Sequence, residues 1–395
     1  MGNNSVSLSN KNPFASQAKM LWHIERLSEW RLQGDTFPIH IEVNPSNYCN
    51  EGCRWCISSY SHISNPSMSK EERKRQIKQL DSKSVISGHP KRRRGIELDS
   101  LKIFMKDASL MGLKAITWSG GGEPTSYLFI QEAIKFSSNL GLNQGMMTNG
   151  LYPKSYIPTF GNNLDWMRVS LDTLDSKKYE HQKFSKRLPD VISNIESIVS
   201  YPISLGINMN LADWNANEVL QIAKWSREVG ASYFQIRPIL GLPFEIENNP
   251  SYRKQLDSNW LTKIKPLLIE AEAISDKNFS VLVSWDKFDD LQNVEGNYGR
   301  SYSKCMSHYF VCVLDADGGL KVCMYHLNDE RFCFGNIYEN SLSEIWKGDQ
   351  RKQVLQMCAN NLDLSTCQVC CKGHEINKFI DFIENPNEKN GVNFL

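Results

Sequence analysis

Strand-like and helix-like segments alternate through residues 39–238, and this alternation limits the possible fold more than any other feature. Six segments are short and apolar, and most stretches between them carry apolar residues at helical spacing. The connections are too long for hairpins, so right-handed β–α–β units and a parallel sheet are expected. Six units fall short of the eight that close a barrel. We therefore predict an α/β fold, a partial (β/α)6 TIM-like barrel that stays open. The predicted strands cover residues 39–43, 115–118, 144–148, 166–172, 204–209 and 233–237.

Polar motifs follow each predicted strand. In parallel α/β folds the chemistry gathers at the C-terminal ends of the strands, so these motifs should meet at one edge of the sheet. Their convergence predicts a functional site more strongly than any one motif does. The motifs are Cys49 to Cys56, Gly120 to Pro124, Thr148-Asn149, Ser170 to Asp172, Asn208 to Asn210, and Arg237.

Three cysteines, Cys49, Cys53 and Cys56, occur at the spacing C-x3-C-x2-C directly after the first strand. No further cysteine occurs until Cys305, so a closed four-ligand site has no nearby fourth thiol. Three thiolates leave a cubic iron–sulfur cluster one ligand short, and an iron with an open position can bind a substrate or cofactor. A zinc-binding module is the alternative interpretation.

Charge and composition indicate where such a chain works. The formal net charge of +1 argues against a protein that mainly coats nucleic acid or anionic membrane. No apolar run is long enough for a membrane span, and the first eleven residues lack a signal-peptide pattern. We therefore expect a cytoplasmic protein, in which eleven cysteines serve metal binding or redox chemistry rather than disulfides.

The cysteine loop, with an aromatic residue at Trp55, resembles the signature of the radical S-adenosylmethionine (SAM) superfamily. The later motifs follow in that family's order, and the match covers residues 38–240. The resemblance implies a [4Fe–4S] cluster on Cys49, Cys53 and Cys56, whose fourth iron chelates the amino and carboxylate groups of SAM. An electron from a reducing partner such as flavodoxin or ferredoxin would then cleave SAM to methionine and a 5′-deoxyadenosyl radical, which abstracts hydrogen from a substrate carbon. The implied SAM contacts are Gly121, Gly122 and Glu123 for the methionine amino group, Ser170 and Asn208 for the carboxylate and ribose, and the backbone of Trp55 for adenine.

A second cysteine-rich region begins at Cys305. Its pattern C-x12-G-x4-C followed by C-x2-C looks like the auxiliary-cluster region of the SPASM and twitch extensions of the superfamily. The resemblance implies one further [4Fe–4S] cluster on Cys305, Cys323, Cys367 and Cys370. No cysteine follows Cys371, which favours the one-cluster twitch form over the two-cluster SPASM form. A structural zinc site is the alternative. The cysteines left over are expected to pack as small apolar side chains in the core, although one of them could instead be a hydrogen donor or a cluster ligand. They are Cys312, Cys333, Cys358 and Cys371.

The chain is expected to divide into a helical extension (1–37), the partial barrel (38–240), a connecting segment (241–300) and a small α+β auxiliary-cluster domain (301–395). Within the barrel, residues 60–97 form a basic insertion: Lys70 to Arg94 holds ten Lys/Arg against three acidic residues. This insertion is either a solvated helix with a mobile loop or a lid that meets an anionic substrate. Asp315 to Gly319 predicts a hairpin turn rather than a calcium loop. Two helices, 342–358 and 374–383, should close the chain.

An auxiliary cluster can take an electron from a substrate radical. We therefore expect oxidation or epimerisation of a small polar metabolite, such as a sugar, aminocyclitol or nucleotide-linked compound. A peptide-modifying maturase is the alternative, although only about 38 residues precede the first strand, fewer than a leader-binding domain needs. An RNA-modifying enzyme that reads phosphate through the basic insertion is a third possibility, disfavoured by the near-zero net charge. The expected partners are thus a small-molecule substrate and a reducing protein, and no association with a membrane is expected.

Overall fold

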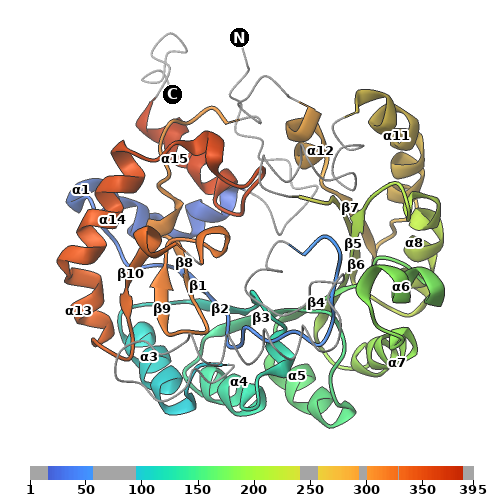
Figure 1. Cartoon of the computed structure of the whole chain (residues 1–395), viewed down its shortest axis with the longest axis horizontal. Helices are drawn as coiled ribbons and strands as arrows, with labels where there is room; N and C mark the ends of the chain where they lie inside the picture. Colours follow the sequence, from blue (N-terminus) through green and yellow to red (C-terminus); the bar gives the residue numbers. More distant parts are fainter. Residues whose placement is uncertain (1–16, 57–94, 241–256, 293–299, 328, 386–395) are drawn as a thin grey trace, which may run out of the picture.

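The structure is a computed structural model that describes residues 17–56, 95–240, 257–292, 300–327 and 329–385. The basic insertion predicted at 60–97 lies almost entirely outside these residues. The architecture is one curved ten-stranded sheet with helices around its outside (Figure 1). The strand order is β10-β9-β8-β1-β2-β3-β4-β5-β6-β7, so the two ends of the sheet do not meet. The predicted open α/β barrel is confirmed.

The strands begin and end close to the predicted positions. The parallel run from β8 to β7 contains all six predicted strands, and the antiparallel pairs β8–β9 and β9–β10 complete the sheet. The strands are β1 (His40–Val43), β2 (Ala115–Trp118), β3 (Asn143–Thr148), β4 (Trp166–Ser170), β5 (Ser204–Leu211), β6 (Tyr233–Pro238), β7 (Ser280–Val283), β8 (Val311–Leu314), β9 (Gly319–Lys321) and β10 (Cys333–Asn336).

The helices pack on the outer face of the sheet and at its ends (Figure 1). They are α1 (Ile24–Gln33), α3 (Leu98–Leu110), α4 (Ile130–Asn139), α5 (Ile157–Asn163), α6 (Ser176–Lys183), α7 (Leu188–Ile198), α8 (Val219–Glu228), α11 (Ser258–Glu272), α12 (Trp285–Gln292), α13 (Leu342–Lys347), α14 (Asp349–Asn360) and α15 (His374–Glu384). The helix predicted over 342–358 is two helices, α13 and α14, because the backbone of Gly348 between them is extended (φ −68°, ψ 156°).

The sheet extends further than six β–α units. β7 lies in the predicted connecting segment and pairs in parallel with β6. β8 lies in the predicted auxiliary-cluster domain and pairs in parallel with β1, with His40 opposite Val311 and Val43 opposite Leu314. The auxiliary region is therefore joined to the barrel through the sheet. Local sequence patterns predict strands but not pairing between segments so far apart.

The two faces of the sheet have opposite character because side chains alternate along each strand. Outward residues such as Ile41, Val169 and Ile207 are fully buried in the main apolar core beneath the helices. Inward residues are mostly polar or charged. We call this inner face the barrel lumen, and its members include His40, Glu42, Thr117, Arg168, Ser170, Asn208, Asn210, Gln235 and Arg237.

The Asp315–Gly319 segment is the predicted turn. The Asp315 N–H donates to the carbonyl of Gly319 at 2.9 Å, and Gly318 has a positive φ of 83°. The buried ammonium of Lys321 lies 3.2 Å from the Asp315 carboxylate and 3.1 Å from that of Asp317. The two carboxylates thus share one cation from the chain itself, which fits a hairpin and not a calcium loop.

Candidate functional site

The three cysteines of the first motif come together on the loop that leaves β1. Cys49, Cys53 and Cys56 are half-buried, and the Cys56 N–H donates to the carbonyl of Cys53 at 3.2 Å. Burial raises the pKa of Cys53, and the charges of Glu51, Cys56 and Cys49 raise it further. The three thiols are therefore close enough to act on one another, and three soft donors at one spot are what an iron–sulfur cluster requires.

The glycine motif after β2 is pressed against this cysteine loop. A Cβ atom at Gly122 would lie 2.5 Å from the carbonyl oxygens of both Ser46 and Tyr48, so only glycine fits there. The next residue, Glu123, donates its N–H to the Tyr48 carbonyl at 2.8 Å. The structure thus places Gly121, Gly122 and Glu123 directly beside the loop that holds the cysteines.

The Glu123 carboxylate is buried and fixed by four donors. It accepts hydrogen bonds from the Thr125 N–H and hydroxyl (3.1 and 2.7 Å), the Thr148 hydroxyl (2.7 Å) and the Asn149 N–H (2.8 Å). Burial raises the pKa of Glu123, although these donors oppose the shift. Asn149 also donates from its side chain to the Asn50 side chain at 2.6 Å and lies 4.0 Å from the Cys49 sulfur. The ends of β2 and β3 are thereby tied to the first cysteine.

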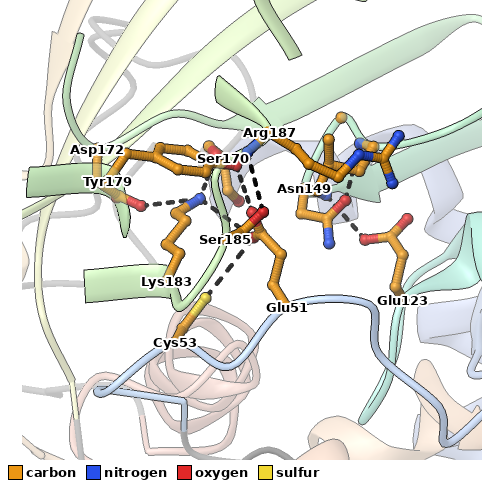
Figure 2. Close-up of polar contacts among 12 residues, drawn as sticks. Glu51, Cys53, Glu123, Asn149, Ser170, Asp172, Tyr179, Lys183, Ser185 and Arg187 are labelled. Carbon is orange, nitrogen blue, oxygen red and sulfur yellow. Dashed lines mark hydrogen bonds and ion pairs between the residues drawn. The ribbon is translucent and has the colours of Figure 1, made fainter. Parts of the chain in front are cut away.

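A buried ionic network supports the loop from the other side (Figure 2). The Lys183 ammonium lies 3.6 Å from the Glu51 carboxylate and 3.3 Å from that of Asp172, and it donates to the Ser170 carbonyl at 2.7 Å. The Tyr179 hydroxyl donates to Glu51, whose other carboxylate oxygen lies 3.8 Å from the Cys53 sulfur. This network fastens the cysteine loop to β4 and α6.

The protonation of this network follows from burial and charge. Burial opposes the charge on Lys183, but the carboxylates of Glu51 and Asp172 outweigh it and hold the lysine pKa well above its usual range. Burial raises the pKa of Glu51, although the charge of Lys183 opposes this shift.

Sequence reasoning missed Lys183, Tyr179 and the whole helix α6. Asp175 could have indicated the start of α6, since Asp is a favoured N-cap residue. Its side chain accepts hydrogen bonds from the Lys177 and Lys178 N–H groups.

Ser170 and Asn208 are brought together as predicted. They face each other as Cα partners on β4 and β5. The side-chain oxygen of Asn208 is buried and accepts no hydrogen bond from the described residues, although buried polar atoms are almost always paired. Trp55 packs its ring on Trp214 with 5.4 Å between centroids. An orphan acceptor, a glycine cradle at Gly122 and three convergent thiols fit the cluster and SAM that the sequence implied.

The second cysteine group lines a pocket next to the lumen. Its walls include four thiols, and Glu42 and Lys372 contribute from the lumen side; the thiols belong to Cys305, Cys323, Cys367 and Cys371. Burial and the charge of the neighbouring Cys305 together raise the pKa of Cys371 to about 11. Burial and the charges of Cys305, Cys371 and Cys367 likewise raise the pKa of Cys323.

Neutral and cationic side chains hold this second group in place. The Asn377 amide lies 3.9 Å from the Cys305 sulfur and accepts two backbone N–H groups at 2.7 and 2.8 Å. The ring of His326 lies 3.7 Å from the Cys367 sulfur. Arg300 is buried and donates to the carbonyls of Cys367 and Gln368 at 3.2 and 2.9 Å.

Cys370, the fourth ligand that the spacing suggested, points away from this pocket. Its sulfur lies 3.6 Å from the Asp290 carboxylate and 3.8 Å from the Lys287 carbonyl on α12. Its backbone is left-handed (φ 52°), and its neighbour Cys371 faces the pocket instead. Two adjacent cysteines cannot be distinguished by spacing alone, because only the backbone conformation decides which one turns inward.

The other cysteines are buried in or beside the apolar core. Cys312 and Cys358 belong to the main core, and the Cys333 sulfur lies 3.5 Å from the Gly335 carbonyl. Among the described residues, no group of three His, Cys, Asp or Glu side chains is compact enough to hold a single metal ion. A cubic cluster separates its sulfur ligands more widely than a single ion does.

Comparison with sequence families agrees with both groups of cysteines. The profile of the radical SAM superfamily matches residues 43–226, and that of the SPASM iron–sulfur cluster-binding domain matches residues 305–371. Together the matches span more than half of the chain. The chain belongs to the radical SAM superfamily. It is therefore an enzyme whose cofactors are SAM, a [4Fe–4S] cluster and an auxiliary iron–sulfur cluster, as predicted. The auxiliary region matches the SPASM model, and the preference for a one-cluster twitch form stays a prediction.

Curated relatives of this radical SAM chain carry nucleotide names. An S-adenosylmethionine-dependent nucleotide dehydratase from Flammeovirga pacifica is 27% identical over 202 residues, which span 49% of this chain and 61% of the dehydratase. A probable GTP 3′,8-cyclase from Pyrococcus abyssi is 27% identical over 249 residues, which span 60% of this chain and 77% of the cyclase.

Solved structures confirm the fold over almost the whole chain. SuiB of Streptococcus suis, bound to SAM, superposes with a TM-score of 0.61 at 15% identity and covers 96% of this chain and 81% of its own. The protein anSMEcpe, also with bound SAM, gives 0.56 at 15% identity and covers 91% of this chain and all of its own. No helix in the described part of this radical SAM chain is long and apolar enough to cross a bilayer.

Proposed function

We propose that this enzyme abstracts a hydrogen atom from a carbon of a small polar metabolite and completes an oxidation or an epimerisation with help from its auxiliary cluster. The observation that carries the proposal is the polar barrel lumen, which includes Glu42 on β1, the strand before the first cysteine loop, and shares Glu42 with the pocket of the second group. A substrate in the lumen would contact charged and amide side chains, which suits a polar molecule.

The first centre would hold the SAM-binding cluster on Cys49, Cys53 and Cys56. When bound, the cluster and SAM supply the radical that takes hydrogen from the substrate. The protein positions SAM: the Gly121–Glu123 loop receives the methionine amino group, while Ser170 and Asn208 receive the carboxylate and ribose. The buried acceptor of Asn208 would gain a hydroxyl partner. Trp55, on the cysteine loop, would contact adenine through its backbone.

The second centre would hold one auxiliary cluster on Cys305, Cys323, Cys367 and Cys371. We place Cys371 in the ligand set instead of Cys370 because its thiol lines the pocket with the other three. Four thiols close a cubic cluster completely, so this centre would exchange electrons without an open iron. An oxidation needs such an acceptor, because a substrate radical that loses a proton must also lose one electron. An external reductant such as flavodoxin or ferredoxin would supply the first centre in the cytoplasm.

A peptide-modifying maturase remains the second candidate. SuiB has been solved with its precursor peptide SuiA, but at 15% identity that likeness concerns the fold. The two curated relatives at 27% identity bear nucleotide names and favour a small molecule.

Product analysis of the anaerobically reconstituted enzyme tests the proposal. With dithionite and SAM it should form 5′-deoxyadenosine and methionine, and with its substrate in deuterated form it should transfer deuterium to 5′-deoxyadenosine. Candidate metabolites and candidate peptides would be compared in the same assay. Deuterium transfer from a peptide but from no metabolite would overturn the small-molecule assignment.

A further inference from the structure

The lumen contains more positive than negative charge, and the excess lies on two arginines. Arg168 on β4 points inward between Met167 and Val169, which are both buried in the outer core. Arg237 on β6 follows Ile236, which is also buried in that core. Alternation along the strands therefore directs both guanidinium groups into the lumen.

Neither guanidinium has an acidic partner among the described residues. Arg168 donates to the Gln235 side-chain oxygen at 2.8 Å and contacts the Met147 sulfur, which are both neutral groups. The Nε of Arg237 is buried without a hydrogen-bond acceptor in the described chain. Burial and the nearby charge of Arg237 lower the pKa of Arg168 to about 10, although the charge of Glu42 acts in the opposite direction.

The ionisable groups around the arginines do not compensate this charge. Glu42 is the lumen carboxylate, and the Lys372 ammonium already lies 2.6 Å from it while Ser119 donates to it at 3.3 Å. Burial lowers the pKa of His40 to about 4, so this imidazole is neutral. The phenols of Tyr233 and Tyr325 are neutral as well, since burial raises the pKa of each. Two like charges with no counterion in contact, among the residues that the structure describes, are costly inside a protein.

The position of the pair suits a substrate. Arg168 precedes Ser170 by two residues on β4, so it lies about 7 Å deeper in the barrel than this candidate SAM contact. Arg237 is the Cα partner of Asn210, two residues beyond Asn208 on β5. The charge of Arg237 acts on Tyr325, which lines the pocket of the second cysteine group. An anion on the pair would thus sit between the two centres.

We infer that Arg168 and Arg237, with Lys372 at the rim, form the receptor for a phosphate group of the substrate, and that the substrate is a phosphorylated metabolite of the nucleoside phosphate class. Guanidinium groups bind phosphate through paired, charge-assisted hydrogen bonds, and two arginines that face the same lumen can supply several donors to its oxygens. The Lys372 side chain is 34% exposed, so its ammonium can donate to an incoming anion while it stays paired with Glu42. The two nucleotide-named relatives support phosphate over carboxylate. The inference rests on the proposed small-molecule function.

Binding to the reconstituted holoenzyme tests the receptor without any turnover. Isothermal titration calorimetry would compare inorganic tripolyphosphate, the four nucleoside triphosphates, the four uncharged nucleosides and citrate. We expect saturable binding of tripolyphosphate and of at least one triphosphate, with nucleosides at least tenfold weaker. Arg168→Gln and Arg237→Gln should each weaken phosphate binding by about 10- to 100-fold, the loss expected for charged hydrogen bonds.

Arg227→Gln is the matched control, because Arg227 is an exposed arginine on α8, outside the lumen. It should change phosphate affinity by less than about twofold. Arg237→Lys retains the positive charge but lacks the paired N–H donors of a guanidinium group. It should therefore give an intermediate loss of phosphate affinity. The iron content and the unfolding midpoint of each variant establish that it is folded. If a variant does not fold, the titrations of the wild-type enzyme still test whether phosphate binds.

Three results would overturn the inference. The first is no saturable binding of any phosphate compound to the wild-type enzyme, or binding of citrate alone. The second is equal phosphate affinity in Arg237→Gln and Arg227→Gln. The third is a loss of SAM affinity in the lumen variants as large as the loss of phosphate affinity, which would assign the pair to the SAM carboxylate. None of these three results decides the proposed function, because SAM cleavage and deuterium transfer to 5′-deoxyadenosine test that function separately.

Discussion

The two groups of cysteines are built in opposite ways. The first has three thiols on eight consecutive residues, and it is surrounded by charged side chains and by glycines that let the backbone approach closely. The second draws four thiols from residues 305–371, and they line a pocket held by an amide, an imidazole and Arg300. The first centre is thus short of one ligand and prepared for an external molecule, whereas the second can satisfy its metal entirely from the chain.

The difference suggests how the labour is divided. A centre with an open position can bind a cofactor directly and begin the chemistry. A centre with four protein ligands can exchange electrons, but it offers no open iron to a substrate. In the function proposed above, the lumen holds the substrate, and its charges select which substrate binds.

The largest expected effect separates the open centre from everything else. Cys53→Ala removes one of three thiols from a site that has no spare ligand, so cluster binding at that site should be lost. We expect 5′-deoxyadenosine formation to fall below detection and iron to fall from about eight to about four per chain. Iron analysis and product chromatography measure both. A Cys53→Ala enzyme that still cleaves SAM would contradict the assignment of the first centre.

The pair Cys370 and Cys371 sharpens the description of the closed centre. Cys371→Ala should reduce iron to about four per chain, because its thiol lines the pocket with the three others. Cys370→Ala serves as the matched control, since its sulfur faces α12, and it should retain about eight irons. The reverse pattern would restore the ligand set that the spacing of the sequence suggested.

The ionic support of the open centre should contribute strongly to stability. Lys183→Met leaves the carboxylates of Glu51 and Asp172 buried without a cation, which costs about 3–5 kcal/mol in the free energy of unfolding. Lys186→Met is the control: that side chain is 81% exposed and pairs with Glu180 at the surface, so about 1 kcal/mol or less is expected. Urea unfolding of the apoprotein measures both. Equal losses in the two variants would show that the network is not structural.

The smallest expected effect concerns β1, the strand that both centres share. His40 lies on β1 beside Thr117, and its pKa of about 4 is below the ordinary 6.5 because burial disfavours the charged ring. Between these two values the unfolded chain takes up a proton and the folded chain does not. The free energy of unfolding should therefore fall as the pH is lowered from 6.5 to 4, by at most about 1.4 kcal/mol per pH unit from this residue.

His40→Gln should remove that contribution while keeping a partner for Thr117. Urea unfolding of the apoprotein at pH 6.5, 5.5 and 4.5 measures the difference in slope. His181→Gln, at an exposed position on α6, is the control and should leave the slope unchanged. An unchanged slope in His40→Gln would show that the ring is protonated in the folded protein.

Sequence reasoning recovered the open barrel and the residues grouped at the first centre, because both depend on local patterns. Cys49, Gly122 and Glu123 lie next to strands that hydrophobic periodicity identifies. The parallel pairing of β8 with β1 could not be predicted, since it joins segments about 270 residues apart whose patterns carry no pairing information. The network around Lys183 was missed for the same reason.

The choice between Cys370 and Cys371 shows a second limit. Spacing identifies a cysteine-rich segment, but the left-handed conformation at Cys370 decides which thiol reaches the pocket. Arg168 was likewise not predicted as a site residue. A single arginine in a strand sequence does not reveal that it shares the lumen with another cation on β6. Such features arise when distant strands align.

The pairing of β8 with β1 also has a consequence for synthesis of the chain. β1 takes β2 as one neighbour early, but its other edge stays unpaired until residues 311–314 have left the ribosome. A nascent barrel therefore exposes a strand edge until the segment of β8 has been made, and exposed edges are sites of aggregation. The side chain of Asn44, at the end of β1, hydrogen-bonds to Asp315 at the end of β8, so this late contact fixes the start of the loop that carries Cys49. The first cysteine centre is thus completed by a segment that is made long after its cysteines.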